Sequence, residues 1–231
     1  TIFMFTNQSK QKHLANVKCR DPAINHTSLS NLRANGKQNS AAATSATRPY
    51  KIMLVGDGMV GKSAICKSYI NKTPYLAYQP TISETHEITV SIHKKDYLVI
   101  LWDTNAGEEW DGLRIQDYKN TDCFILCYAI NDPTSLSNVE TRWILELRKH
   151  CPNVPVLLVG TKTDIRTPSN RWISEEEGDI LKTKVKAEGF IECSSKSIAS
   201  IEGVFILAVS IAEKYRESET QSNSRRLCLI L

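Results

Sequence analysis

The chain has 231 residues, of which 41% are apolar and 23% are charged, so it is long enough to bury one sizeable core. Its formal net charge of +4 is unevenly distributed. Residues 1–49 carry +6, because seven Lys or Arg residues face a single acid, Asp21, whereas the rest of the chain carries −2. The body of the chain therefore lacks the basic surface of a nucleic-acid-binding protein, and we expect no nucleic-acid partner.

The cysteine content favours a reducing compartment. The chain has seven cysteines and no C-x-x-C pair, which argues against a disulfide framework or a zinc site. No uninterrupted apolar stretch is long enough to span a bilayer. The opening residues Thr1–Thr6 are too few for the apolar region of a secretory signal. These features predict a cytosolic protein.

Residues 1–49 are rich in Asn, Ser, Ala, Thr and Lys and show no sustained periodicity. Such a segment buries too little apolar surface to offset its ordering entropy, so we expect a disordered basic extension. A basic arm on acidic lipid and a transit peptide remain open as functional alternatives, because the segment is poor in acids. A solvated tail is the favoured interpretation.

The pattern becomes that of a folded domain at Tyr50. The apolar run Lys51–Val55 predicts a buried strand, and Gly61–Ile70 predicts a helix. Apolar residues alternate with polar ones over Ile88–Ile92, which is typical of a half-buried strand. A polar turn then leads into a further strand over Tyr97–Trp102.

The second half of the chain continues the alternation. Cys123–Ile130 and Val154–Gly160 are continuous apolar runs, the form expected of parallel strands covered on both faces. Between them, apolar residues recur at near-helical spacing, namely Leu136, Val139, Trp143, Leu145 and Leu147. Ile191–Ser194 predicts a last strand. The apolar face of a final helix comprises Ile201, Val204, Phe205, Ala208, Ile211 and Ala212.

This order of strands and helices implies right-handed crossovers. We therefore predict an α/β fold. It has a mainly parallel six-stranded sheet with one antiparallel edge strand and helices on both faces.

The strongest motif runs from Gly56 to Ser63 and matches G-x-x-x-x-G-K-[ST] between a predicted strand and a predicted helix. Glycines let backbone N–H groups turn inward around phosphate oxygens, and the helix N-terminus adds a positive dipole. Lys62 can reach the β- and γ-phosphates, and the Ser63 hydroxyl can ligate Mg²⁺. The alternative, a turn that matches by chance, is disfavoured by this context.

A second motif, Thr161-Lys162-Thr163-Asp164, matches the [NT]-K-x-D element of guanine-specific P-loop proteins. The Asp164 carboxylate can accept hydrogen bonds from guanine N1–H and N2–H₂, a pair that adenine lacks. The aliphatic stem of Lys162 can lie over the base. A weaker match, Cys193–Lys196, resembles an S-A-K loop whose backbone N–H groups near Ser195 meet guanine O6. An ATP-using enzyme such as a small kinase is the less favoured alternative.

Two further residues complete a predicted metal site. Asp103 follows a strand within Trp102-Asp103-Thr104 and resembles a Walker-B Asp. Thr81 lies between the first helix and second strand and resembles a switch I Thr, whose hydroxyl meets Mg²⁺ and whose N–H senses the γ-phosphate. We predict Ser63, Thr81 and Asp103 as metal ligands; a capping or loop role is the alternative for the last two.

These segments, with Arg142–Arg166, resemble the Ras superfamily over residues 50–231, and within it the Rho family. The resemblance implies the P-loop NTPase fold and a small GTPase that binds GTP or GDP with Mg²⁺. It assigns catalytic roles to Lys62, Thr81 and Gly107. The predicted nucleotide-binding residues are Gly56, Asp57, Gly58, Met59, Val60, Gly61, Lys62, Ser63, Ala64, Thr81, Ala106, Thr161, Lys162, Asp164, Ser194, Ser195 and Lys196.

The last four residues, Cys228 to Leu231, match a C-a-a-X box in which a final Leu favours geranylgeranylation of Cys228. One prenyl chain usually needs a second membrane signal, and Arg225 and Arg226 form only a thin basic patch. The basic N-terminal extension is a hypothetical second signal. We expect three regions: the extension 1–49, a GTPase domain over 50–215 and a tail over 216–231.

The segment after Asp103 departs from the family sequence D-T-A-G-Q-E. Without gaps, Ala106 replaces the glycine that meets the γ-phosphate, and Gly107 replaces the Gln that positions water. If the alignment shifts by one residue, Gly107 is that glycine and Glu108 takes the Gln position. The ungapped version keeps the spacing to Thr121-Asp122 and is preferred. Either version lacks the Gln, so we expect very slow hydrolysis and a poor response to a GTPase-activating protein.

Other departures concern the base and the effector loop. Pro74 stands where the family has a Phe packed against guanine, and the adjacent Tyr75 is a candidate substitute; without one, nucleotide release is expected to be fast. Ile82–His86 differs from the Rho V-F-D-N-Y run, so the usual effectors are not assumed. The stretch between Arg166 and Ile191 is too short for a full Rho insert helix, although Ser174–Glu177 resembles a helix start.

The leading prediction is a nucleotide-dependent signalling switch of the cytoskeletal or membrane-traffic type. The main rival is a GTPase-deficient module that stays bound to GTP and binds effectors. The implied partners are exchange factors, effectors, GTPase-activating proteins and a dissociation inhibitor for the prenyl tail. The implied location is the cytoplasm and the cytoplasmic face of a membrane, with the plasma membrane preferred.

Overall fold

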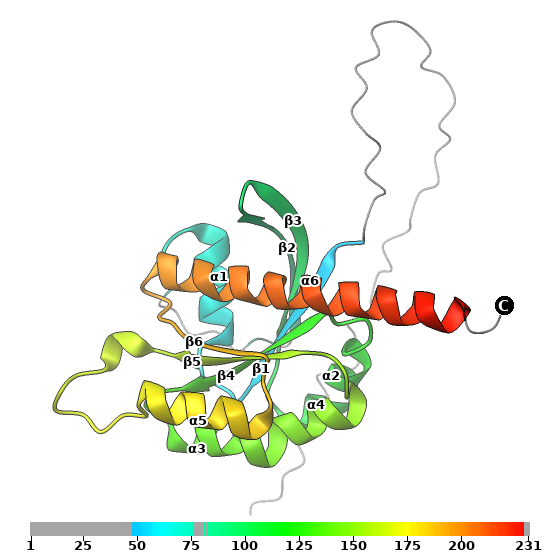
Figure 1. Cartoon of the computed structure of the whole chain (residues 1–231). Coiled ribbons are helices and arrows are strands. Elements are labelled where there is room, and N and C mark those ends of the chain that lie inside the picture. The colour runs from blue at the N-terminus through cyan, green and yellow to red at the C-terminus, as the bar shows by residue number, and fades with distance from the viewer. Residues whose placement is uncertain (1–47, 76–80, 82, 229–231) are drawn as a thin grey trace, which may run out of the picture. The chain divides into compact units, whose positions relative to one another are not determined.

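The computed structural model describes residues 48–75, 81 and 83–228, with side chains up to 221. The predictions for most of the N-terminal extension, for Ile82 and for the Cys228 thiol lie outside these described parts. Within them, one sheet has the order β2-β3-β1-β4-β5-β6 (Figure 1). The strands are β1 Tyr50–Gly56, β2 Ser83–Ile92, β3 Lys95–Thr104, β4 Cys123–Ala129, β5 Val156–Thr161 and β6 Gly189–Glu192.

The strand directions confirm the predicted fold class. β2 and β3 pair antiparallel through a turn at His93 and Lys94, both of which have positive φ. All other neighbouring strands pair parallel. Parallel neighbours need crossover connections, and the helices supply them.

Helices cover both faces of the sheet (Figure 1). Helices α1 (Lys62–Asn71) and α6 (Ile198–Cys228) pack on one face. On the other lie α3 (Pro133–Asn138), a π-helical turn over Val139–Trp143, α4 (Ile144–His150) and α5 (Glu175–Val185). The short helix α2 (Asp111–Asp117) follows β3 after a 3-10 turn, Glu108–Trp110. A second 3-10 turn spans Thr163–Ile165.

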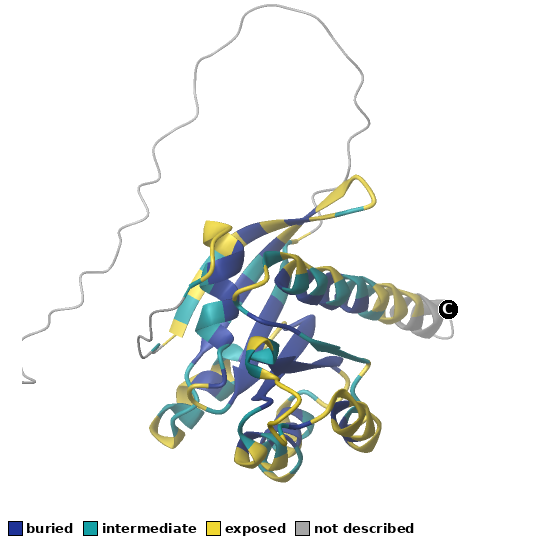
Figure 2. Ribbon diagram, turned by 90° about the vertical axis from the view of Figure 1, so that its left-hand side faces the viewer, coloured by how far each residue is buried: buried dark blue, intermediate teal, exposed yellow. Residues whose placement is uncertain are grey.

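The alternation of side chains along β1 explains why two cores form. Ile52 and Leu54 point into the core under α1 and α6, whereas Met53 and Val55 point into the opposite core. All four are fully buried. In Figure 2 the central strands are correspondingly dark, whereas the exposed residues lie on the outer sides of the helices, in the turns and along the β2–β3 hairpin.

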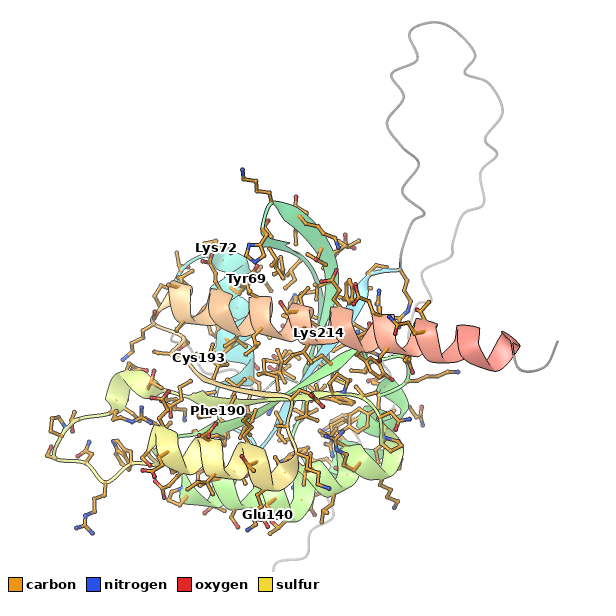
Figure 3. All side chains as sticks on the ribbon, in the orientation of Figure 1. Tyr69, Lys72, Glu140, Phe190, Cys193 and Lys214 are labelled. Carbon is orange, nitrogen blue, oxygen red and sulfur yellow. The ribbon has the colours of Figure 1, made fainter. Side chains whose placement is uncertain are left out.

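The predicted apolar face of the last helix is confirmed, because all six of its residues are buried. Phe205 packs against Tyr69 of α1, with 4.5 Å between the ring centroids. The ammonium group of Lys72 lies 3.8 Å from the centroid of the same Tyr69 ring (Figure 3). No Gly or Pro follows Gly203, so nothing in the sequence interrupts the helix before Cys228. The tail expected from residue 216 therefore begins inside α6.

The start of the domain is tied to α6 through a buried carboxylate. Asp122 is fully buried and accepts hydrogen bonds from Arg48 at 2.7 and 3.0 Å and from Arg216 at 2.6 and 2.8 Å. The backbone N–H of Lys51 donates to it as well, at 2.8 Å. A buried charge with this many donors is well compensated.

Two details differ from the sequence pattern. The last strand is Gly189–Glu192, two residues earlier than expected, so Ser194 lies in the loop that follows. Leu145 is one of the apolar residues at near-helical spacing, but it is 62% exposed, while the neighbouring Ile144 is buried. Leu145 lies two residues after Trp143, which is about 200° around an α-helix. None of the helices within the described residues combines the length and apolarity that crossing a bilayer requires.

Candidate nucleotide-binding site

A cavity of about 400 Å³ opens where β1, β3 and β5 end. Ligands of open parallel sheets typically bind at this edge, outside the carboxyl ends of the strands. The cavity is lined by Gly58, Met59, Gly61, Lys62, Ser63, Ala64, Tyr75, Thr81, Thr104, Asn105, Ala106, Lys162, Asp164, Ile165, Ser195 and Lys196. The two sequence motifs and the two switch segments thus meet around one space.

The P-loop, Gly56–Ser63, has the backbone that the motif predicts. Gly56 has φ +133°, and a Cβ there would lie 2.3 Å from the Cys127 carbonyl oxygen, so only glycine fits. Gly61 has φ +100° and precedes α1, whose first turn is capped by no side chain. Those free N–H groups and the helix dipole favour an anion at this end of the cavity.

Lys62 supplies the only ammonium of the P-loop and is almost fully buried. Its Nζ donates to the carbonyl oxygens of Gly56 and Asp57, each at 2.7 Å. Burial lowers the pKa of Lys62, and the nearby carboxylates of Asp103 and Asp57 oppose this. A buried cation beside a cavity lined with backbone donors is suited to a phosphate.

The predicted metal ligands come together beside it. The hydroxyls of Ser63 and Thr81 are 2.8 Å apart. Asp103 is fully buried, and neither of its carboxylate oxygens has a hydrogen-bond partner among the described residues. Burial raises the pKa of Asp103, while the positive charge of Lys62 acts against the rise. A buried carboxylate with unpaired oxygens next to two hydroxyls is the hard oxygen set that suits Mg²⁺.

The guanine motif forms the other end of the cavity. Lys162 has φ +64°, and Asp164 follows it in the 3-10 turn. The Asp164 carboxylate accepts from Ser194 Oγ at 2.6 Å and pairs with Lys196 Nζ at 2.7 Å. Burial acts to raise the pKa of Asp164, but the bonds from Lys196 and Ser194 outweigh it, so the pKa is lowered. The group is thus an ionised acceptor, as recognition of two guanine N–H donors requires.

Comparison with known proteins agrees with this geometry. The sequence model of the Ras family matches residues 51–214. The chain belongs to the Ras family. It is also 37% identical over 193 residues to the Ras-like GTP-binding protein RhoL of Drosophila melanogaster, an alignment that covers 83% of this chain and 100% of that protein. The chain is therefore a GTP-binding small GTPase of the Ras superfamily with a Rho-like relative.

Several residues predicted to touch the nucleotide are not among those that line the cavity of this Ras-family domain. Val60 is buried, and its carbonyl accepts from Thr161 Oγ1 at 2.5 Å. Thr161 Oγ1 also contacts the Tyr128 carbonyl at 3.0 Å, so Thr161 joins the P-loop to β4. Ser194 holds Asp164. Through these hydrogen bonds, the residues hold the P-loop and Asp164 in place.

The switch II segment, residues 105–107, follows β3. Ala106 lines the cavity and Gly107 does not. The Gly107 N–H donates to Asn105 Oδ1 at 2.9 Å. Glu108 is 84% exposed at its side chain and faces Arg142 at 3.7 Å. This geometry favours the ungapped alignment, in which Ala106 meets the phosphate end.

Tyr75 lies on the cavity wall, whereas its neighbour Pro74 is exposed and does not. The backbone N–H of Tyr75 donates to Ser68 Oγ of α1 at 2.8 Å, and Lys67 lies over the Tyr75 ring at 5.3 Å. An aromatic residue is thus part of the cavity wall. This supports Tyr75 as the substitute for the Phe of the family.

The residues that support the P-loop and switch II through hydrogen bonds belong to no motif found in the sequence. Asp57 bonds to Trp143 and Asn138, and the carbonyls of segment 105–107 accept from Arg114 and Arg142. Two features of the sequence could have indicated these contacts: a charged residue inside the P-loop, and an Arg-Trp pair inside an apolar helix pattern.

The predicted helix start at Ser174 is confirmed. Ser174 caps α5 and forms a capping box with Glu177.

Proposed function

We propose that this chain is a Rho-type signalling switch that binds GTP and GDP with Mg²⁺ and hydrolyses GTP very slowly. The P-loop would hold the phosphates, with Lys62 at the β- and γ-phosphates. Asp164 would accept from guanine, with Lys162 along the base and the loop at Ser195 near its O6. The match to the Ras family supports the binding of guanine nucleotide, and the cavity geometry supports these roles.

Ser63, Thr81 and Asp103 fit the cation, because they offer two hydroxyls and one buried carboxylate with unpaired oxygens. A bound Mg²⁺ would neutralise phosphate charge. Asp103 would anchor the cation, and Thr81 would tie the switch I segment to the nucleotide state. Loss of the γ-phosphate would release Thr81 and segment 105–107, which is the usual form of a switch transition.

Slow hydrolysis rests on one observation: Ala106 lies on the cavity wall and is followed by Gly107, which has no side chain to orient water. The side chain that follows it, Glu108, faces Arg142 at 3.7 Å and is 84% exposed. Orienting the attacking water is a main protein contribution to this reaction. The chain therefore keeps the binding machinery without the usual water-positioning group.

The direct test is to identify the nucleotide bound to the purified full chain and to follow its turnover. After loading with GTP and Mg²⁺, we expect GTP to persist far longer than on a Ras-family protein with the Gln. Release of phosphate at the rate usual for the family would contradict slow hydrolysis while leaving nucleotide binding intact.

The rival function is a module that stays bound to GTP and acts only by binding effectors. The contacts of Arg114 and Arg142 with three successive switch II carbonyls favour it, because they restrain the segment that hydrolysis would release. The same turnover experiment separates the two. A switch converts its bound GTP to GDP, however slowly, whereas a constitutive module leaves the GTP intact.

We also propose geranylgeranylation of Cys228, with exchange factors, effectors, a GTPase-activating protein and a dissociation inhibitor as partner classes. Anchoring would place the protein at the cytoplasmic face of a membrane. The support is the C-a-a-X sequence and the partner classes of the superfamily. Mass spectrometry of the C-terminal peptide from native material tests it; an unmodified Cys228 would contradict it.

A further inference from the structure

Asp57 puts a negative charge inside a loop that is built to bind phosphate. It lies between Gly56 and Gly58, and its backbone carbonyl contacts Lys62 Nζ at 2.7 Å. Yet the Asp57 carboxylate does not line the cavity. One of its oxygens accepts from Trp143 Nε1 at 2.6 Å and the other from Asn138 Nδ2 at 2.7 Å. Both oxygens are thus directed to the helix behind the P-loop.

The two donors are aligned by the π-helical turn. Asn138 ends α3, Trp143 ends the π-helical turn, and the two are five residues apart. In an α-helix five residues are about 140° out of phase, whereas a π-helical turn brings residues i and i+5 to one face. The turn therefore lets one stretch of helix present both donors to one carboxylate.

Two guanidinium groups contact the indole of Trp143. Trp143 is fully buried, and the guanidinium groups of Arg114 and Arg142 lie 4.8 and 4.7 Å from its ring. Arg114 is itself fixed by Glu146 at 2.9 Å and by Asp111 at 2.6 Å. The same two arginines donate to the carbonyls of segment 105–107. The donor to Asp57 is therefore part of a rigid network that also touches switch II.

We propose that Trp143 and Asn138 are positioning residues that keep the Asp57 charge away from the phosphates, and so set the relative affinity for GTP and GDP. The inference rests on the proposed nucleotide binding. A carboxylate that is free to rotate toward the cavity repels a triphosphate more than a diphosphate, because Coulomb repulsion grows with the phosphate charge. Held by two donors, Asp57 adds little to that repulsion.

The test compares dissociation constants for GDP and for a non-hydrolysable GTP analogue on the Mg²⁺-loaded full chain. Asn138→Leu removes one donor at a half-buried position and keeps the branched shape and the number of heavy atoms of the side chain. We expect about a tenfold loss of affinity for the GTP analogue, the size of one hydrogen bond to a charged group, and a smaller loss for GDP. Trp143→Phe, checked for folding by circular dichroism, should act in the same direction.

The decisive arm adds Asp57→Asn to Asn138→Leu. If the charge is what matters, the double variant regains the wild-type ratio of the two affinities. Equal losses for both nucleotides, without rescue, would show that Asn138 only supports the loop, and would overturn the proposal. So would an unchanged ratio in Asn138→Leu.

Tyr97→Phe is the matched control, because it removes a buried donor to the Glu213 carboxylate, at 2.9 Å, from residues that do not line the cavity. Its affinity ratio should equal that of the wild type; a change as large as that of Asn138→Leu would also overturn the proposal. A wild-type chain that binds neither nucleotide would instead refute the proposed function, so the two failures are distinguishable.

Discussion

Replacing Gly107 by Gln should restore the missing water-positioning group and accelerate GTP hydrolysis. The backbone permits the change, since Gly107 has φ −66° and ψ 140°, values that any residue adopts. A Cβ at this position would lie 2.5 Å from the Glu109 carboxylate, but Glu109 is an exposed, flexible side chain that can move. The substitution is therefore sterically feasible at modest cost.

The expected gain follows from what one positioned polar group contributes to a transition state. Removing such a group typically costs on the order of 10² to 10³ in rate, so Gly107→Gln should gain on the order of 10²-fold. That gain corresponds to about 2.7 kcal/mol of transition-state stabilisation. The assay is phosphate release in a single turnover of preloaded GTP at saturating Mg²⁺.

Gly112→Gln provides the matched control, because Gly112 lies in α2 with open space around its Cβ position. It should leave hydrolysis unchanged and stabilise the helix by up to about 1 kcal/mol, the usual penalty of Gly relative to good helix formers. A Gly107→Gln rate equal to that of the wild type, in a variant that still binds GTP, would refute the ungapped alignment and the account of slow hydrolysis.

Three further predictions follow from charged groups. Asp164→Ala should lose two charge-assisted bonds to guanine, about 3 kcal/mol or more, and weaken GDP binding at least about a hundredfold in a fluorescent-nucleotide titration. Asp122→Asn leaves Arg48 and Arg216 with a neutral partner in a buried site and should cost roughly 3 kcal/mol in urea unfolding; a loss within error would contradict the buried network. Because the folded pKa of Asp164 is depressed, its contribution to stability is complete above its unfolded value of about 3.9 and disappears as pH falls through the folded value. Unfolding of Asp164→Asn should accordingly depend less on pH below about 4 than the wild type does, and equal slopes would count against the Asp164–Lys196 pair.

Much of the fold could be predicted because its signals are local. Continuous apolar runs identified β4 and β5 as buried parallel strands, and the P-loop pattern placed a strand before it and a helix after it. The boundaries of β6 were less predictable. Cys193 is buried like a strand residue, and its N–H still donates to the Gly160 carbonyl at 2.8 Å, although the regular strand ends one residue earlier.

The support behind the site depended on long-range contacts that no local pattern encodes. Asp57 and Trp143 are 86 residues apart in the chain, and their hydrogen bond requires the π-helical turn that the spacing of apolar residues did not reveal. Likewise, Arg114 and Arg142 meet the switch II carbonyls from two different helical segments. A charged residue in the P-loop indicated only that some partner was needed.

The cavity lined by Lys62 and Asp164 should bind guanine nucleotide selectively. The most direct measurement displaces a fluorescent GDP from the Mg²⁺-replete full chain with unlabelled GTP, GDP or ATP. We expect GTP and GDP to displace the fluorescent GDP, and ATP at the same concentrations to displace none of it. Equal competition by ATP, or no binding of the GDP probe by folded protein, would contradict it.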